Sequence, residues 1–257
     1  MIDTHCHLDT PAFDADRDAM LARAAAAGVR GMLVPAIRPR TWPALVELAA
    51  RTERVGVRCA LGIHPQIVPE LAPDELAGDL EDRLATALTS ARAIAVGESG
   101  LDGGTGELAL QERLFRAHIR VARALELPLV IHVLRAHDAA PRILREEGPV
   151  TGVLHSYSGG AELVPVYRAL GLAFSFAGPI SYANARRPVE AARGIPPELL
   201  LVETDAPDQA PEGHRGGRSE PAFLPAVLAG LAAARGSSVE EMAVLTTANA
   251  TRIFSTW

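Results

Sequence analysis

The sequence predicts an α/β fold, a (β/α)8 TIM barrel with an additional C-terminal helix. Eight short apolar or β-branched runs alternate with helix-length amphipathic segments, the pattern of parallel strands joined by crossover helices. The length of 257 residues suits one such barrel, so we expect a single domain over residues 1–257. An open doubly wound sheet is the alternative. It predicts a glycine-rich phosphate-binding turn after the first strand, where this chain has His5-Cys6-His7-Leu8-Asp9.

The expected strands are short and mostly apolar. Leu129-Val130-Ile131 is apolar without interruption, as expected of a strand that is covered on both faces. The eight strands are expected at Met1–His5, Gly31–Ile37, Arg58–His64, Ala93–Glu98, Leu129–Val133, Thr151–His155, Ala173–Ala177 and Leu199–Thr204.

The expected helices fill the intervals between these strands. In Glu107–Leu127, apolar residues recur at helical spacing, as in a helix that buries one stripe against a sheet. The residues of this stripe are Leu108, Phe115, Ile119, Ala122 and Leu125. Ser238 and Glu241 have the spacing of a capping box, which predicts the start of the additional last helix, Val239–Ile253. The longest irregular stretch, Pro207–Pro221, is expected to be a functional loop at the mouth of the barrel.

Charge and composition narrow the class of protein. The net charge of −6 predicts no extended basic surface for a nucleic-acid duplex. All 25 basic residues are arginine, which excludes Schiff-base catalysis by lysine and a metal pair bridged by a carboxylated lysine. Cys6 and Cys59 are expected at or in strands, where a reduced thiol packs as a small apolar side chain. The sequence has neither a signal-peptide pattern nor an apolar run of about 18 residues, so we expect a cytoplasmic protein without a membrane segment or an obligate protein partner.

Seven polar side chains are expected at the carboxyl ends of strands. They are His5 and His7 at the first strand, His64 at the third, Glu98 at the fourth, His132 at the fifth, His155 at the sixth and Asp205 after the eighth. In a barrel these ends converge on the face that carries the active site. Any one of the seven alone could be a core histidine or a helix cap, but seven costly polar groups at equivalent positions indicate a metal centre.

The number of candidate ligands exceeds the four that one zinc ion takes. We therefore expect two divalent cations, Mg, Mn or Zn, because imidazole and carboxylate ligands suit several metals. The predicted ligands are His5, His7, Glu98, His132, His155 and Asp205. Glu98 is predicted to bridge the cations, and Asp205 to bind one of them and accept a proton from water. Divalent metals lower the pKa of bound water towards neutrality, which predicts a hydrolase. His64 is predicted to contact the substrate rather than a metal.

Short motifs at these positions are similar to those of a known family. They are Ile2–Asp9, Gly62–Pro65, Gly97–Asp102, Ile131-His132, His155–Gly159, Glu203–Pro207, Arg215-Gly216 with Glu220-Pro221, and Asn249–Phe254. Over nearly the whole chain they resemble the TatD-like metal-dependent hydrolases of the amidohydrolase-type barrels, with Ser99 where isoleucine is usual. The resemblance implies a divalent-metal barrel with the same six ligands. It also implies a deoxyribonuclease, usually magnesium-dependent, whose substrate is the end of a DNA strand, so single-stranded DNA ends are expected.

Two departures from the family pattern leave the substrate open. Leu134 stands where an arginine is common, with Arg135 next to it, and Asp208 stands where a tyrosine is common. A carboxylate beside a phosphodiester is unfavourable. Arg135 and Arg215 are nevertheless predicted substrate contacts, because arginine can bind phosphate bidentately. His214, Arg215 and Arg218 are the loop residues expected at a phosphate.

Two alternative functions follow from the same residues. The first is metal-dependent hydrolysis of a small amide, lactone or ester, which the net negative charge, Leu134 and Asp208 favour. The second is a barrel that binds metal without catalysis. It predicts closed, fully ligated ions with no open position for water.

Overall fold

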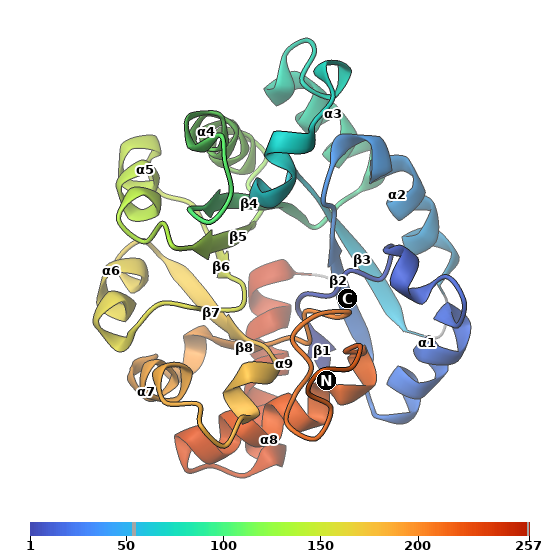
Figure 1. Ribbon diagram of the computed structural model, residues 1–257, viewed down its shortest axis with the longest axis vertical. Helices are drawn as coiled ribbons and strands as arrows, with labels where there is room; N and C mark the ends of the chain where they lie inside the picture. Colours follow the sequence, from blue (N-terminus) through green and yellow to red (C-terminus); the bar gives the residue numbers. More distant parts are fainter. Residues whose placement is uncertain (53–54, 256) are drawn as a thin grey trace.

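The computed structural model describes residues 1–52, 55–255 and 257, and its eight strands form a parallel barrel. Each strand pairs in parallel with the next one along the chain, and Thr4 N donates to Val202 O at 3.2 Å between the first and last strands. The ring of strands lies inside a ring of helices (Figure 1). The strands are β1 Ile2–Asp3, β2 Gly31–Pro35, β3 Gly56–Leu61, β4 Ala95–Asp102, β5 Leu129–Leu134, β6 Gly152–Leu154, β7 Leu172–Phe176 and β8 Leu200–Val202. The predicted TIM barrel is confirmed.

The helices follow the strands in alternation, and one more lies at the end of the chain. The α-helices are α1 Arg17–Ala26, α2 Trp42–Arg51, α3 Leu80–Ala91, α4 Leu108–Ala124, α5 Ala139–Glu147, α6 Val164–Arg168, α7 Arg187–Gly194, α8 Leu224–Arg235 and α9 Val239–Phe254. The 3-10 helices are η1 Pro11–Phe13, η2 Pro39–Thr41, η3 Pro65–Glu70, η4 Pro73–Glu75, η5 Ala161–Leu163, η6 Gly178–Ser181, η7 Pro197–Leu199 and η8 Pro221–Phe223. The predicted capping box opens α9, since Ser238 Oγ accepts from Glu241 N and the Glu241 carboxylate accepts from Ser238 N.

One residue of the predicted apolar stripe on α4 is misplaced. Leu108, at the first position of the helix, is exposed, whereas Phe115, Ile119 and Ala122 are buried as predicted. Periodicity does not show where the neighbouring elements stop covering a helix end. Among the described residues no single helix is long and apolar enough to cross a membrane, although Pro221–Arg235 and Val239–Phe254 pass that test as a bent pair.

The strand ends differ from those predicted at four places that matter for function. β1 ends at Asp3, β3 at Leu61 and β6 at Leu154, so His5, His64 and His155 lie just beyond these strands. β4 instead continues to Asp102, which corrects the prediction that Glu98 ends the strand. Its pairing with β5 continues past the apolar run because Gly100 lies against the β5 backbone, where a Cβ would stand 2.0 Å from a carbonyl oxygen. Glu98 therefore projects from within a strand that is paired on both of its sides.

The barrel interior has an apolar layer to which every strand contributes one residue. These residues are Ile2, Leu33, Ala60, Ala95, Val130, Val153, Ala173 and Leu201. Ala250 and Phe254 of α9 belong to the same cluster. The additional helix thus closes one end of the barrel, and the polar side chains are left to the other end.

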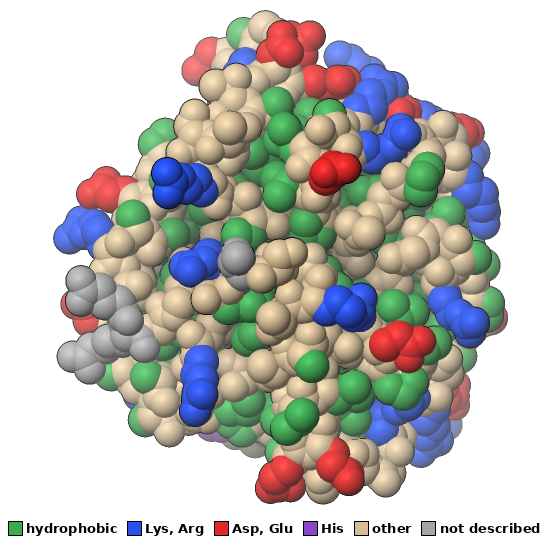
Figure 2. Space-filling model, turned by 180° about the vertical axis from the view of Figure 1, so that it is seen from behind, with side chains coloured by type: hydrophobic (Ala, Val, Ile, Leu, Met, Phe, Trp, Pro, Cys, Tyr) green, Lys and Arg blue, Asp and Glu red, His purple; other side chains and the backbone are tan. Residues whose placement is uncertain are grey.

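The two ends of the barrel carry different side chains. In Figure 1 the loops after β3, β7 and β8 lie in front of the barrel, including Pro207–Pro221 in orange. Figure 2 shows the opposite end, where arginine and acidic side chains are scattered among apolar ones and histidine is almost absent. The histidine-rich end is therefore the carboxyl end of the strands, as predicted.

Candidate metal centre

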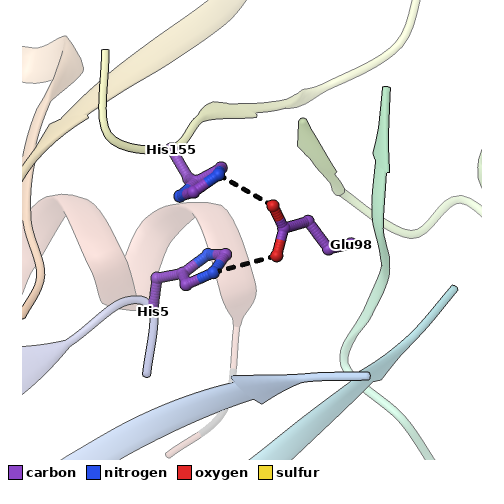
Figure 3. A group of neighbouring side chains, drawn as sticks. All are labelled: His5, Glu98 and His155. Atoms are coloured by element: carbon purple, nitrogen blue, oxygen red, sulfur yellow. Dashed lines mark ion pairs between the residues drawn. The ribbon is translucent and has the colours of Figure 1, made fainter. Parts of the chain in front are cut away.

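The centre of the site is the carboxylate of Glu98, which is 0% exposed. Its two oxygens make no hydrogen bond, yet imidazole nitrogens face both of them. His5 Nε2 lies 3.1 Å from Oε2, and His155 Nε2 lies 2.8 Å from Oε1 (Figure 3). Burial alone would raise the pKa of Glu98, but the surrounding imidazoles, His155 foremost, hold it well below its usual range. A buried, ionised carboxylate without hydrogen bonds is a natural cation ligand.

The other predicted ligands form two groups, one beside each oxygen of Glu98. On the Oε2 side, Asp205 Oδ1 lies 3.5 Å from His5 Nε2 and 3.8 Å from His7 Nε2. On the Oε1 side, His132 Nδ1 lies 3.0 Å from His155 Nε2. The structure thus brings together all six residues that the sequence singled out as ligands: His5, His7, Glu98, His132, His155 and Asp205. Their nitrogen and carboxylate donors suit a divalent transition metal or magnesium.

Two carboxylates without a predicted role lie beside the outer ring nitrogens of the histidines on the Oε1 side. Asp102 Oδ2 lies 3.3 Å from His132 Nε2, and Glu203 Oε1 lies 3.4 Å from His155 Nδ1. A ring nitrogen that donates to a carboxylate leaves the lone pair of the other nitrogen free for a cation, which applies to Nδ1 of His132. His155 Nδ1 makes no hydrogen bond, so Glu203 is a charged neighbour of His155 and not its hydrogen-bond partner. In the sequence these two residues are recognisable only as acidic residues at the ends of strands.

His64 has the opposite proton arrangement. Its Nδ1 accepts a hydrogen bond from Gln66 N at 3.0 Å, so the ring proton of the neutral form is on Nε2. That Nε2 faces Glu98 Oε1 at 2.8 Å. Burial lowers the pKa of His64, which favours this neutral form. His64 therefore carries its hydrogen on Nε2, close to Glu98 Oε1 but without the geometry of a hydrogen bond. Its contact with a substrate stays a prediction.

A cavity of about 500 Å³ opens onto the cluster. Its walls are formed by His7, His64, Gln66, His132, Val133, Leu134, His155, Ser156, Ser158, Asp205, Asp208 and Gln209. The volume is in the range of small-molecule sites. Candidate ligands that line an open cavity differ from the closed ligand sphere of a structural ion.

The arginines predicted to contact substrate lie elsewhere. Arg135 is exposed and borders a separate hollow with Glu112 and Arg142. Arg215 lies over the ring of Tyr182, 4.1 Å from its centroid. Of the residues described along the cavity wall, none is an arginine. The cavity wall as the structure shows it lends no support to an arginine at the substrate, and the contacts of Arg135 and Arg215 stay predictions.

The neighbours of Arg215 in the loop are also engaged away from the cavity. Arg218 pairs with Asp16 at 2.7 Å, and the ring of His214 stacks on Phe223 at a centroid distance of 3.8 Å. The sequence identified the loop correctly but not which of its residues reach the site. Those are Asp208 and Gln209.

Asp205 combines a candidate ligand oxygen with a candidate proton acceptor. Its Oδ1 faces His5 and His7, and its Oδ2 accepts a hydrogen bond from Gln209 Nε2. Burial raises the pKa of Asp205 to about 6, against the lowering effect of His155 and His5. At neutral pH the carboxylate is ionised and still close to its pKa, as suits a general base.

Comparisons with known proteins show relatives of this chain in sequence and in fold. The family model described as TatD related DNase matches residues 2–255. YabD of Bacillus subtilis, an uncharacterized metal-dependent hydrolase, is 31% identical over 258 residues, which cover 99% of this chain and 98% of YabD. The crystal structure of YjjV, a TatD homologue from Escherichia coli, has a TM-score of 0.90 at 30% identity and covers 100% of this chain and 98% of that one. An uncharacterized amidohydrolase from Saccharomyces cerevisiae shares the fold, with a TM-score of 0.85 at 18% identity over 98% of this chain and 99% of that one.

Metal binding is expected to weaken as the pH falls. Ligands must lose their protons, and Asp205, with a pKa of about 6, is protonated below that value, while Glu98 holds the pKa of His155 well above its usual range despite burial. We expect affinity for Mn²⁺ to fall at least about tenfold per pH unit below pH 6. Calorimetric titration from pH 5 to 8, in two buffers of different ionisation enthalpy, measures both the affinity and the protons released. Equal affinity at pH 5 and 7 would contradict the ligand assignment.

Proposed function

This chain belongs to the TatD related DNase family of metal-dependent hydrolases, and we propose that it cleaves phosphodiester bonds at the ends of single-stranded DNA. The observation that carries the proposal is the buried Glu98 carboxylate, with donor groups on both sides, next to candidate ligands that line an open cavity. The name of the family model supports DNA as the substrate.

We propose that two divalent cations, Mg²⁺, Mn²⁺ or Zn²⁺, bind at this cluster. His5, His7 and Asp205 would hold one, His132 and His155 the other, and Glu98 would bridge them, with one oxygen towards each group. Such cations polarise a phosphoryl oxygen and bring the pKa of water near neutrality. Imidazole nitrogens lie beside both oxygens of Glu98, which supports a pair of ions rather than a single ion.

The side chains supply the proton transfers and the positioning. In the proposal Asp205 accepts the proton of the attacking water, which its pKa of about 6 suits. Glu98 acts catalytically by holding its negative charge fixed between the two groups. His64 donates its Nε2 hydrogen to a substrate oxygen, since the Gln66 amide holds Nδ1 as the acceptor.

We further propose that residues 1–257 act as one catalytic domain in the cytoplasm. Every side chain of the cluster comes from this chain, so no partner is needed to complete it. Both cysteines, Cys6 and Cys59, are free and buried, as in proteins of a reducing compartment.

Hydrolysis of a small ester, lactone or amide is the second candidate, and Asp208 favours it. Asp208 is exposed and lines the cavity, and Leu134 adds an apolar wall. A free carboxylate repels a polyanion and attracts an ammonium group. A substrate with a neutral or cationic group beside the scissile bond fits this wall better than DNA does.

The nuclease proposal predicts metal-dependent release of nucleotides from end-labelled single-stranded DNA. With Mg²⁺ or Mn²⁺, Asp205→Asn is expected to lower the rate by about 100-fold or more, because the near-isosteric amide cannot accept the proton. Product length on sequencing gels shows whether cleavage starts at an end. Equal release of nucleotides by the wild type and by Asp205→Asn would contradict the proposal.

The second candidate predicts turnover of p-nitrophenyl esters, lactones or amides above the level of Asp205→Asn. If Asp208 selects a cationic group, Asp208→Asn lowers kcat/KM for an α-ammonium ester by about fivefold, the effect of one exposed ion pair. An ester of the same size without the ammonium group is the control and is expected to be unaffected. Turnover no greater than that of Asp205→Asn on the whole panel would count against the second candidate.

A further inference from the structure

Gln209 makes a hydrogen-bonded link between the loops that follow β6 and β8. Its Nε2 donates to Asp205 Oδ2, and its Oε1 accepts from Ser156 Oγ at 2.8 Å. We infer that Gln209 is a positioning residue, which holds the Asp205 carboxylate so that Oδ1 faces the cluster. The inference rests on the proposed role of Asp205 as ligand and base.

The amide of Gln209 has only one orientation that satisfies both contacts. The ionised Asp205 carboxylate only accepts hydrogen bonds, so the NH₂ group must face it. The amide oxygen then faces Ser156, whose hydroxyl can donate. A flipped amide would set two oxygens against each other at Asp205. Asp205 therefore determines which end of the amide faces it, and Ser156 anchors the other end, so that Gln209 is held against Asp205.

Asp205 has little else to hold its side chain. Among the described residues, His5 Nε2 and His7 Nε2 lie 3.5 and 3.8 Å from Oδ1, beyond hydrogen-bond distance. The Gln209 amide is in direct hydrogen-bond contact with Oδ2. Rotation of the carboxylate about its terminal torsion, which is broad in aspartate, is thus restrained mainly by Gln209.

The backbone is shaped to make this link. Asp205, Gln209 and Ser156 have φ values of +50°, +52° and +41°, in the left-handed region that side chains other than glycine seldom adopt. Asp208 N donates to Asp205 O at 2.9 Å, which closes the turn and brings Gln209 back over Asp205. Strained residues of this kind persist where surrounding contacts determine them, and they cluster at functional sites.

The link reaches the other side of Glu98 as well. Ser156 N donates to Glu203 Oε1 at 2.5 Å, and the same oxygen faces His155 Nδ1. Gln209 and Ser156 therefore join Asp205 of one donor group to His155 of the other through Glu203. Because the linking amide is neutral, it orients Asp205 without cancelling its charge.

The test is a double-mutant cycle on metal affinity. Gln209→Leu keeps the approximate size but removes both hydrogen bonds, Ser156→Ala removes only the anchor, and the double variant combines them. Calorimetry with Mn²⁺ and the visible spectrum of the Co²⁺ protein report the ligand geometry, and kcat and KM are measured on whichever substrate is turned over.

We expect Gln209→Leu to weaken one metal site by about 10- to 100-fold, to shift the Co²⁺ spectrum and to lower kcat more than it raises KM. Ser156→Ala is expected to give a smaller loss in the same direction. The double variant is expected to be no worse than Gln209→Leu, since both act through one link.

Unchanged metal affinity and an unchanged Co²⁺ spectrum in Gln209→Leu would overturn the inference, as would additive losses in the double variant. If Gln209→Leu does not fold, as judged by thermal unfolding without metal, Ser156→Ala alone decides, and no change in its Co²⁺ spectrum would overturn the inference. Asp205→Asn separates the two proposals. Wild-type metal affinity and activity in Asp205→Asn would refute the role of Asp205, whereas a loss there without one in Gln209→Leu would refute only the role of Gln209.

Discussion

The burial of one ionised carboxylate is the constraint on which the rest of the site depends. Glu98 has no exposed surface, and a buried negative charge without partners costs several kcal/mol. Imidazole nitrogens from the loops after β1, β3 and β6 and from β5 surround it, so the barrel as a whole supplies the compensation. Because the carboxylate makes no hydrogen bond, it remains available to cations on both sides. A site of this kind requires strands that converge, which is what a parallel barrel provides.

In the same barrel, the apolar layer and the polar cluster lie at opposite ends. One apolar residue from each strand, with Ala250 and Phe254 of α9, fills the lower interior. The polar cluster lies at the other end, beneath the loops that follow the strands, and loops tolerate change better than the elements they connect. Asp208 and Gln209 lie on such a loop. These two residues therefore border the cavity from a loop, whereas Glu98 and His132 of the cluster lie within strands.

The fold and the cluster could be predicted from the sequence because both depend on strand periodicity. Eight apolar runs located the strands, and His5, His132 and His155 came next to their ends, so their convergence followed from the barrel. Contacts between side chains of different strands could not be predicted in this way. Asp102 lies beside His132 and Glu203 beside His155 only because of the direction in which their side chains point in the folded barrel. The strand β4 continues past Glu98 because Gly100 allows close pairing with β5, which the apolar content of the sequence does not reveal. Arg215 was expected at the substrate but lies over Tyr182, a choice of partner that depends on tertiary structure.

The central claim is that Glu98 joins two cation sites, and metal stoichiometry tests it most directly. Protein purified without chelators, reloaded with Mn²⁺ or Zn²⁺ and analysed by mass spectrometry for metal per chain, should hold two ions. Glu98→Gln replaces one ligand oxygen by a group that cannot coordinate, so it should lose at least one of the two. A single ion in the wild type, or two ions retained at unchanged affinity in Glu98→Gln, would contradict the account.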